Sequence, residues 1–424
     1  MDAIAEATAA TWMREAAARA RAASSVLAQS PAGQRNAALR QAATALRAAS
    51  DVIVAANAQD LAAFDAGRGT PAFRDRLALS PERVAAMADG LDGIAALPDP
   101  LARTLAEWSM PNGLRFQRIA APIGVIGMIY ESRPNVGADA AGLCLKSGNA
   151  VILRGGSDSF HSARAIQQAM RAGLVAAGLP EDAVQIPPAT DRAYVGAMLA
   201  AAGQIDLIIP RGGKSLVTRV QAEARVPVLA HAEGLCHTYI HEAANPDMAR
   251  AILVNAKLRR PGVCGATETL LIDAAIAPSL LPLLVADLRA GGCEFRAGPR
   301  ARAIVPELPA AAPGDFDTEW LAPMLSVAVV DGMAAALAHI RAHGSEHTEA
   351  IVTDDAQAAE QFLRGLDSAV VLWNASTQFC DGGEFGFGAE IGIATGRLHA
   401  RGPVGLEQLT SFRTLVRGSG QVRP

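Results

Sequence analysis

From about residue 119 onward, short apolar runs alternate with segments of helix length, and this pattern restricts the folds that the chain can adopt. The first four apolar runs are residues 123–130, 150–153, 207–209 and 226–229. Segments with helical periodicity, such as residues 163–177, separate them. Strands that alternate with helices pair in parallel, because a parallel connection needs a crossover and the crossover is usually a helix. The expected fold class is therefore α/β.

A second alternation follows, and it predicts a second α/β unit. Its candidate strands are residues 238–240, 267–272, 325–330, 350–352 and 369–373. Between the first two, Asn245 and Pro246 supply a cap and a first-position proline for a helix that ends before Pro261. The first hundred or so residues are rich in Ala, Arg and Leu at helical spacing, and we expect them to be helical.

Length and charge exclude several classes of protein. The 424 residues suggest two or three domains, and the formal net charge is only −4, without a block of five like charges. This balance argues against nucleic acid or an anionic membrane as a partner. Uncharged stretches reach only 13 residues, as at 274–286, whereas a membrane-spanning helix needs about 20. The N-terminus is Ala-rich and helical, without the basic start and apolar core of a targeting segment, and we expect an ordinary first helix. The small, odd number of cysteines favours a cytoplasmic location.

Cysteine and histidine spacings predict no metal site. His343 and His347 are four residues apart but lack the His-Glu-x-x-His pattern of a zinc hydrolase. The cysteines are few and odd in number, and they lack a Cys-x-x-Cys pair, which argues against a disulfide framework and a zinc site. They are Cys144, Cys236, Cys264, Cys293 and Cys380.

Cys264 has a setting that suits a nucleophile. It stands in the stretch RRPGVCGATETLLI, in a Gly/Pro loop between a predicted helix and a predicted strand. Arg259 and Arg260 lie a few residues upstream, and nearby cations lower a thiol pKa toward the reactive thiolate. The alternative is a buried structural thiol, and these residues alone leave both interpretations open. The other four cysteines lack such a setting.

Two glycine motifs fail as nucleotide signatures. The stretch RGGKS at residues 211–215 ends like a phosphate-binding P-loop, but the required first glycine would fall at Ile208. Gly124 and Gly127 do not form a G-x-G-x-x-G pattern. Any dinucleotide site must therefore be built without that fingerprint.

Five segments, in order along most of the chain, resemble one family. They are residues 129–136, 143–156, 209–215, 255–264 and 381–412. The last of these, DGGEFGFGAEIGIATGRLHARGPVGLEQLTSF, is the most specific. They are similar to the glutamate-5-semialdehyde dehydrogenases, also called γ-glutamyl phosphate reductases, of the aldehyde dehydrogenase superfamily. The resemblance implies an aldehyde-dehydrogenase-like fold, with a Rossmann-type cofactor domain, an α/β catalytic domain and a small β oligomerisation flap.

The resemblance also implies catalytic roles. Cys264 matches the catalytic cysteine of the superfamily. Asn135 resembles the asparagine whose amide, with the backbone N–H of the cysteine, forms an oxyanion hole. A turn or helix-cap residue after Pro134 is the alternative for Asn135. Glu233 lies near the water-activating base of hydrolytic relatives, but its surroundings differ and we leave it out of the catalytic set, because reduction of an acyl phosphate needs no deacylating water.

A cofactor site follows from the same resemblance. Glu319, four residues before Pro323, matches the glutamate that holds the nicotinamide ribose. Gly212 and Gly213 match the glycine turn beside the pyrophosphate, where a helix N-terminus approaches it. Arg154 follows the strand that carries the adenosine-ribose contact, where a cation suits a 2′-phosphate and hence NADP(H). A surface arginine is the alternative for Arg154.

The implied function is NADPH-dependent reduction of L-glutamyl 5-phosphate to L-glutamate 5-semialdehyde and phosphate, through a cysteine thioester, in L-proline biosynthesis. The small-molecule substrate comes from glutamate kinase, and a contact with that kinase stays open. A homo-oligomer is expected, because the strand-rich tail would otherwise leave unpaired edges. The alternatives are a hydrolytic aldehyde dehydrogenase of the superfamily and a non-enzymatic NADP-binding redox sensor.

The expected domain boundaries follow the superfamily. An NADP-binding domain spans residues 1–236, with a flap hairpin at about 105–120 and a returning segment at about 362–385. A catalytic domain spans 237–361, and an oligomerisation tail spans 386–424.

Overall fold

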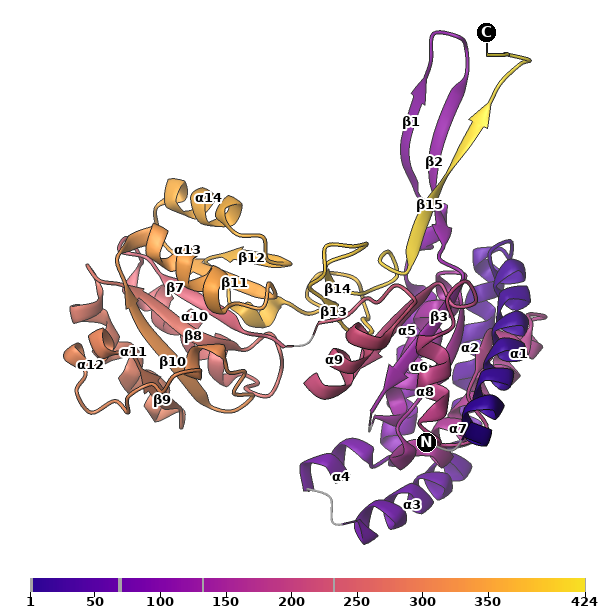
Figure 1. The fold of residues 1–424 in the computed structure, drawn as a ribbon, viewed down its shortest axis with the longest axis horizontal. Helices are drawn as coiled ribbons and strands as arrows, with labels where there is room; N and C mark the ends of the chain where they lie inside the picture. Colours follow the sequence, from indigo (N-terminus) through magenta and orange to yellow (C-terminus); the bar gives the residue numbers. More distant parts are fainter. Residues whose placement is uncertain (1–2, 68–70, 132, 232, 424) are drawn as a thin grey trace. The chain divides into compact units, whose positions relative to one another are not determined.

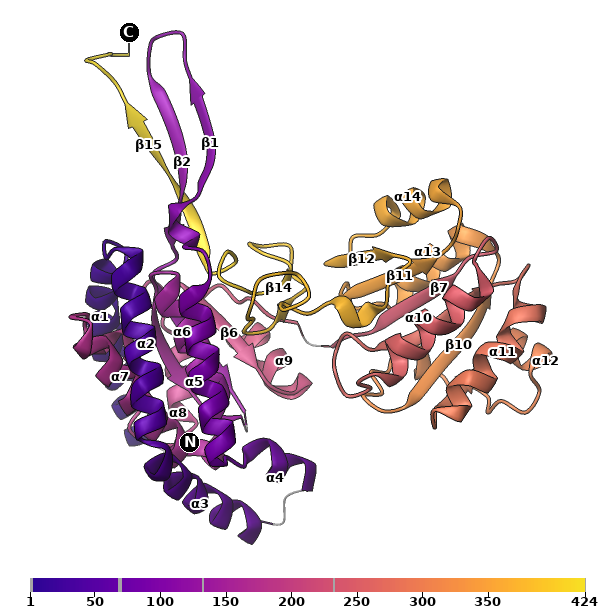
Figure 2. The same cartoon turned by 180° about the vertical axis from the view of Figure 1, so that it is seen from behind.

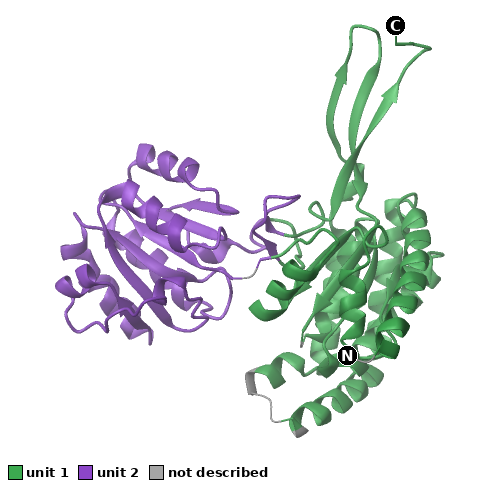
Figure 3. Cartoon of the chain, in the orientation of Figure 1, with its two compact units in different colours: residues 1–230, 386–392, 404–424 green, residues 231–385, 393–403 purple. Residues whose placement is uncertain are grey.

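The computed structural model describes residues 3–67, 71–131, 133–231 and 233–423, which fall into two compact units. Unit 1 comprises residues 1–230, 386–392 and 404–424 (green in Figure 3). Unit 2 comprises residues 231–385 and 393–403 (purple). Each unit contains its own parallel sheet, which confirms the α/β fold class. Across the described ranges, no helix combines the length and the apolar character that a membrane crossing requires.

The central sheet of unit 1 has the strand order β5-β4-β3-β6, with every pairing parallel. Its middle strand β3 is apolar and buried along its whole length, as expected for a strand covered on both faces. In the register, Ile126 of β3 faces Val151 on one side and Leu207 on the other. The strands are β3 (Val125–Tyr130), β4 (Ala150–Arg154), β5 (Val184–Gln185) and β6 (Leu207–Arg211).

Helices of unit 1 cover this sheet in two groups. Helices α1 and α8 pack together, whereas α6 packs with α2, α5 and α7, and both α1 and α6 contact β3 and β4 (Figures 1 and 2). The predicted helical character of the first hundred residues is confirmed by α1 to α5. The helices are α1 (Ala3–Leu27), α2 (Ala32–Ala48), α3 (Ser50–Ala66), α4 (Pro71–Leu77), α5 (Pro81–Ala96), α6 (Pro134–Lys146), α7 (Phe160–Ala176), α8 (Ala193–Leu199) and α9 (Lys214–Glu223).

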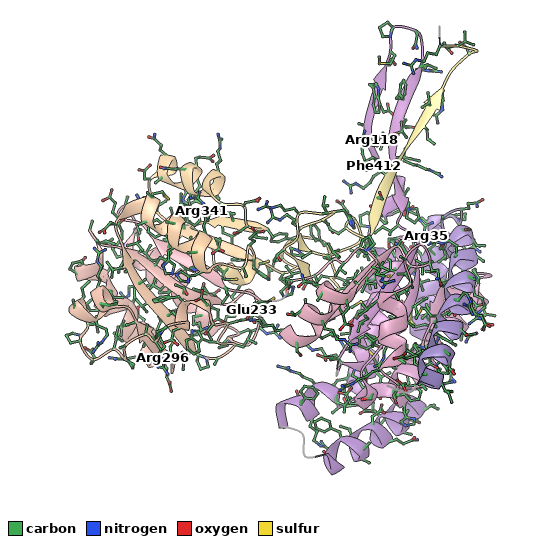
Figure 4. The ribbon with its side chains drawn as sticks, in the orientation of Figure 1. Arg35, Arg118, Glu233, Arg296, Arg341 and Phe412 are labelled. Atoms are coloured by element: carbon green, nitrogen blue, oxygen red, sulfur yellow. The ribbon has the colours of Figure 1, made fainter. Side chains whose placement is uncertain are left out.

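A separate three-stranded antiparallel sheet, here called the flap, joins distant parts of the sequence. Strand β2 (Arg115–Pro122) pairs with β1 (Thr104–Ser109) on one side and with β15 (Thr410–Arg417) on the other. The expected hairpin near residues 105–120 and its pairing with the C-terminal tail are both present (Figure 1). Across the flap, the Arg118 guanidinium stacks 4.6 Å from the centre of the Phe412 ring (Figure 4).

Unit 2 is built on a six-stranded parallel sheet in the order β12-β11-β7-β8-β10-β9. One face packs against α10, α11 and α12, and the opposite face packs against α13 and α14. Its strands are β7 (Cys236–Ile240), β8 (Thr267–Asp273), β9 (Glu294–Ala297), β10 (Met324–Val330), β11 (Thr348–Val352), β12 (Val370–Trp373) and the separate pair β13 (Ile393–Ala394) and β14 (Gly402–Pro403). Its helices are α10 (Pro246–Leu258), α11 (Ala277–Ala290), α12 (Pro299–Ile304), α13 (Gly332–His343) and α14 (Ala356–Gly365).

Three details differ from the sequence-based expectations. The run at residues 226–229 forms only an isolated bridge, between Val228 and Ile208, in a segment where Pro227 has no N–H to donate. The short strands β5 and β9 were not predicted, because neither contains a long apolar run. Residues 362–385, expected to return to the first domain, group instead with unit 2. The segments that group with unit 1 are residues 386–392 and 404–424, and the roles assigned to the domains stay predictions.

Candidate active site

Cys264 lies in the loop between α10 and β8 of unit 2. The cap prediction for α10 is confirmed, because the Asn245 side chain accepts a hydrogen bond from the Met248 N–H at 3.1 Å and Pro246 takes the first turn. All five cysteines are thiols, and four of them are buried whereas Cys264 is partly exposed. Burial raises the pKa of the Cys293 thiol to about 12 and raises that of Cys144 further, which keeps both protonated. Cys264 is therefore the cysteine that a substrate can reach most readily.

The backbone of Gly234 packs closely against the backbone of Cys264. A Cβ at Gly234 would lie 2.7 Å from the carbonyl carbon and 2.8 Å from the Cα of Cys264, so the two backbones leave no room for a side chain. The Gly234 N–H donates to the Glu319 carboxylate at 2.9 Å. The Cys236 thiol donates to the Cys264 carbonyl at 3.1 Å. The structure thus brings Glu319 to the cysteine loop through Gly234, a residue that the sequence analysis did not single out.

These groups share one edge of the unit 2 sheet. Gly234 precedes β7, Cys264 precedes β8, Glu319 precedes β10 and His347 precedes β11. Because all these strands are parallel, their amino ends lie at the same edge. The general rule for open α/β sheets places ligands at the carboxyl ends instead. The segment before β7 also carries Glu233 (labelled in Figure 4).

A buried ion pair connects the two elements on either side of the cysteine loop. The Lys257 ammonium at the end of α10 lies 2.6 Å from the Glu268 carboxylate in β8, and both side chains are almost fully buried. The other oxygen of Glu268 accepts the Leu321 N–H at 3.2 Å, two residues from Glu319. Burial raises the pKa of Glu268 to about 7, although Lys257 opposes this rise. One pair therefore ties together the two elements that flank Cys264 and the segment that carries Glu319.

Two histidines adjoin Cys264, although sequence spacing gave no sign of them. His231, His347 and Cys264 offer ligand atoms that all lie within 4.8 Å of one another. The two rings meet edge to face, with their centres 5.1 Å apart. His347 is fully buried, and burial lowers its pKa to about 3, so the ring is neutral at physiological pH. His231 lies 33 positions before Cys264 in the chain, and His347 lies 83 positions after it. Only the folding of the sheet could therefore bring the three residues together.

The remaining predicted residues gather at the carboxyl edge of the unit 1 sheet. Counting from β3, the strand order is 3-2-1-4, so the order reverses between β3 and β6, which is where open sheets of this kind bind nucleotides. Asn135 follows β3, at the second position of α6, where its amide donates to the Asp139 carboxyl at 3.3 Å. Burial raises the pKa of Asp139 to about 6. Asn135 is thus in unit 1, and Cys264 and Glu319 are in unit 2.

The glycine turn lies after β6, at the start of α9. A Cβ at Gly212 would lie 2.8 Å from the Leu216 side chain and would clash with the Glu131 carboxylate. At Gly213, by contrast, the described residues beyond its chain neighbours place no atom within 4 Å of the Cβ position, which leaves open space beside the helix N-terminus. The Gly213 N–H donates to Glu131 at 3.0 Å. A carboxylate therefore accepts a backbone N–H at the N-terminus of α9, which is the helix end that carries a partial positive charge.

Arg154 ends β4 and is largely buried. Its guanidinium donates to the Thr190 carbonyl at 2.8 Å and to the Gly155 carbonyl, while its Nε finds no partner among the described residues. Arg154 lines a small cavity together with Gly155, Gly156, Phe160, Ala163, Ile186, Pro187, Ala189 and Thr190. A surface arginine does not fit this burial, so that alternative is wrong.

Comparisons with known proteins agree with this architecture. A model of the aldehyde dehydrogenase family matches residues 1–294. The gamma-glutamyl phosphate reductase of Gluconobacter oxydans (strain 621H) is 72% identical over 404 residues, which cover 95% of this chain and 94% of that protein. The chain belongs to the aldehyde dehydrogenase family, among its γ-glutamyl phosphate reductases. The enzyme of that name from Acidiphilium cryptum (strain JF-5) is 68% identical over 412 residues, which cover 97% of both chains.

Solved structures support the same family. The crystal structure of gamma-glutamyl phosphate reductase from Thermotoga maritima superposes with a TM-score of 0.95 at 40% identity, covering 97% of this chain and 100% of that one. An acetylating aldehyde dehydrogenase from Geobacillus thermoglucosidasius shares the fold, with a TM-score of 0.69 at 18% identity over 99% of both chains. The predicted family and its aldehyde-dehydrogenase-like fold are therefore confirmed.

The aldehyde dehydrogenase family uses NAD or NADP, and two features of unit 1 bear on where such a dinucleotide would bind. Open space lies at Gly213 beside the N-terminus of α9, which is ten residues long, and a phosphate that binds there must displace the Glu131 carboxylate from the Gly213 N–H. The unpartnered Nε of Arg154 is a buried donor beside a cavity. Arg154 therefore offers one donor to a phosphorylated ligand, at a cavity that must widen before such a ligand can enter.

Proposed function

We propose that this chain reduces L-glutamyl 5-phosphate to L-glutamate 5-semialdehyde and phosphate, with Cys264 as the nucleophile and NADPH as the reductant. The observation that carries the proposal is the close match along nearly the whole chain to γ-glutamyl phosphate reductases, combined with a partly exposed thiol walled by Gly234. In this proposal the product serves L-proline biosynthesis.

In the first step, the Cys264 thiolate attacks the carbonyl carbon of the acyl phosphate. A C–S bond forms, the C–O bond to phosphorus breaks, and phosphate leaves. The Asn135 amide and the Cys264 backbone N–H act as the donors for the negative charge that develops on the acyl oxygen. Fixed donors of this kind lower the barrier by about 3–4 kcal/mol each in other enzymes.

The second step starts from the thioester on Cys264. A bound nicotinamide would supply a hydride for the thioester carbonyl. The C–S bond of the thiohemiacetal on Cys264 then breaks, which releases the aldehyde and the thiolate. Gly234 and the buried pair of Lys257 and Glu268 hold the cysteine loop in place during both steps. Their contribution is positional, because none of the three reacts with substrate in this scheme.

In this proposal four residues hold the cofactor. Gly212 and Gly213 admit the pyrophosphate at the start of α9, and Arg154 binds the 2′-phosphate that distinguishes NADPH from NADH. Glu319 holds the nicotinamide ribose, with one carboxylate oxygen fixed by the Gly234 N–H. A carboxylate suits this role because it accepts hydrogen bonds from ribose hydroxyls.

Three further properties belong to the proposal. The flap pairs with a second copy of the chain, because β1 and β15 are sheet edges that expose apolar side chains such as Trp108 and Val416. The substrate is supplied by glutamate kinase, because a labile acyl phosphate must be made by phosphoryl transfer to the γ-carboxylate. A cytoplasmic location suits five cysteines that are all thiols.

The test is the reverse reaction of the purified chain, with semialdehyde, NADP and varied phosphate. We expect oxidation only when phosphate is present, with acyl phosphate as product. Cys264→Ser abolishes turnover while NADP binding remains, and Asn135→Ala lowers kcat by about 100-fold to 1,000-fold. Oxidation without phosphate that yields glutamate would instead identify a hydrolytic aldehyde dehydrogenase, and turnover unchanged in Cys264→Ser would exclude this nucleophile.

A further inference from the structure

The cluster of His231, His347 and Cys264 has the composition of a metal site. Its three ligand atoms, two ring nitrogens and one sulfur, lie within 4.8 Å of one another, and all three residues belong to unit 2. Cysteine sulfur and imidazole nitrogen are the protein ligands that Zn²⁺ prefers. Catalytic zinc sites have three protein ligands and one open position, whereas structural zinc sites have four protein ligands.

The hydrogen bonds of the two rings orient their nitrogens for such a role. The His231 Nδ1–H donates to the Ile393 carbonyl at 2.8 Å, which puts the lone pair of the neutral ring on Nε2. The His347 Nδ1 lies 2.8 Å from the Thr348 hydroxyl, with the Cys236 thiol at 3.5 Å. A metal-bound histidine is normally fixed in this way, by a hydrogen bond at its second nitrogen.

A second observation concerns the side chain of His347. His347 is fully buried, and its Nε2 has no hydrogen-bond partner among the described residues. Leaving a buried polar atom unpaired costs about 1–3 kcal/mol, and such an atom calls for an explanation.

The cluster needs only a small contraction to hold an ion. Zinc bonds of about 2.3 Å to sulfur and about 2.0–2.1 Å to nitrogen leave tetrahedral ligands about 3.3–3.6 Å apart. Atoms within 4.8 Å therefore move by about 1 Å, which rotation of the partly exposed Cys264 and His231 side chains supplies. Zinc binding also deprotonates a coordinating thiol.

We propose that His231, His347 and Cys264 bind one Zn²⁺ ion, and that the bound ion blocks the enzyme reversibly by occupying the sulfur. The blocking rests on the proposed function of Cys264, whereas the binding itself does not. The sequence analysis predicted no metal site from spacing, and this site differs in kind because three separate loops contribute one ligand each.

The experiment measures metal binding directly, on the full-length chain freed of metal with a chelator. Equilibrium dialysis with Zn²⁺ should show one ion per chain, and Co²⁺ should give a sulfur-to-cobalt charge-transfer band. In parallel, micromolar Zn²⁺ should suppress turnover, and a chelator should restore it. Absence of stoichiometric binding, or absence of the sulfur band, would overturn the proposal.

Variants locate the ion. His347→Asn should weaken Zn²⁺ binding by at least about tenfold, because even loss of an outer partner of a metal ligand costs about 10-fold to 100-fold. The matched control is His339→Asn, because His339 in α13 also has a buried Nε2 without a described partner. Its affinity for Zn²⁺ should match that of the unmodified chain. Equal affinity in all three proteins would place the ion elsewhere and refute the assignment.

Two safeguards keep the result interpretable. If His347→Asn does not fold, as judged by circular dichroism, Cys264→Ser gives the same test and should remove the sulfur band. Dialysis needs no turnover, so failure of the proposed reaction and failure of zinc binding are separate outcomes. A chain that binds zinc without phosphate-dependent activity would refute only the function, whereas an active chain without the band would refute only the metal site.

Discussion

The backbone of Gly234 lies directly against the backbone of Cys264, so closely that a Cβ at Gly234 would be 2.8 Å from the Cα of the cysteine. The contact joins the segment before β7 to the loop before β8. Because both partners are backbone, neither can swing aside as a flexible side chain would. The position of the sulfur therefore depends on a residue without a side chain, 30 positions earlier in the sequence.

Gly234→Ala should displace the cysteine loop. We expect kcat to fall by at least about tenfold and stability to fall by about 1–3 kcal/mol, the usual cost of overpacking. Gly93→Ala is the control, because Gly93 is exposed in helix α5 with no atom within 4 Å of its Cβ position. That variant should be as stable as the parent or more stable by up to about 1 kcal/mol. Steady-state kinetics and urea unfolding check both; an unimpaired Gly234→Ala enzyme would show that the loop adapts.

The buried pair of Lys257 and Glu268 should respond differently to single and double substitution. Lys257→Met leaves the Glu268 carboxyl buried without its partner, at a cost of about 3–5 kcal/mol. Lys257→Met with Glu268→Leu removes both charges, so most of that stability should return. The double variant also loses the hydrogen bond that Glu268 accepts from the Leu321 N–H. Steady-state kinetics should therefore separate the effect of the pair on activity from its effect on stability. Urea unfolding of both variants is the measurement, and a double variant no more stable than the single one would contradict the argument.

Stability should fall on acidification because of buried neutral histidines. The folded pKa of His347 is about 3, below the ordinary value of 6.5, so between pH 6.5 and 3 the unfolded chain binds a proton that the folded chain does not. The free energy of unfolding therefore decreases as the pH falls through this window, by up to about 1.4 kcal/mol per pH unit for this group. Above pH 6.5 the group contributes no pH dependence.

His347→Asn should remove this part of the slope. Urea unfolding at pH 7.5, 6.5, 5.5 and 4.5 gives the slope for each protein. His399→Asn is the control, because His399 is exposed in the described structure and its loss should leave the slope in place. If the slopes of the parent and His347→Asn coincide, the ring is already protonated or solvated in the folded chain, contrary to its burial.

Arg154 should decide the choice between NADPH and NADH. Arg154→Gln removes a charged donor, and hydrogen bonds to charged groups contribute about 1.5–3 kcal/mol. We therefore expect kcat/KM for NADPH to fall by about 10-fold to 100-fold, with little change for NADH. Arg164→Gln, in the neighbouring helix α7 with its guanidinium over the Phe160 ring, is the control. Equal losses with both cofactors would assign Arg154 a structural role.

The flap should govern assembly. Val416 in β15 is exposed, and Val416→Asp places a charge where we propose that a second copy docks. Light scattering should then report the mass of a single chain, whereas the parent gives a multiple of it. Val175→Asp provides a matched control, because Val175 is an equally exposed valine on helix α7 of the same unit. A parent chain that is already monomeric would refute the proposed pairing.

Local sequence signals predicted those parts of the fold whose cause is local. Asn245 and Pro246 marked the start of α10 because a cap and a first-turn proline act within one turn of the helix. The apolar run of β3 marked a buried central strand for the same reason. The apolar run at residues 226–229 predicted a strand that does not form, because Pro227 limits pairing to one bridge. The strand β9, with a charged residue at each of two positions, gave no apolar run to detect.

By itself, the sequence determined the α/β class and the family and singled out Cys264 as the candidate nucleophile, because periodicity and motifs are properties of neighbouring residues. It could not reveal that Gly234, Glu319 and His347 lie beside that cysteine. Their proximity arises because parallel strands bring their amino ends to one edge of the sheet, whatever the distance along the chain. Only the tertiary structure could decide these contacts, since backbone packing and burial depend on strand order, which no local pattern encodes.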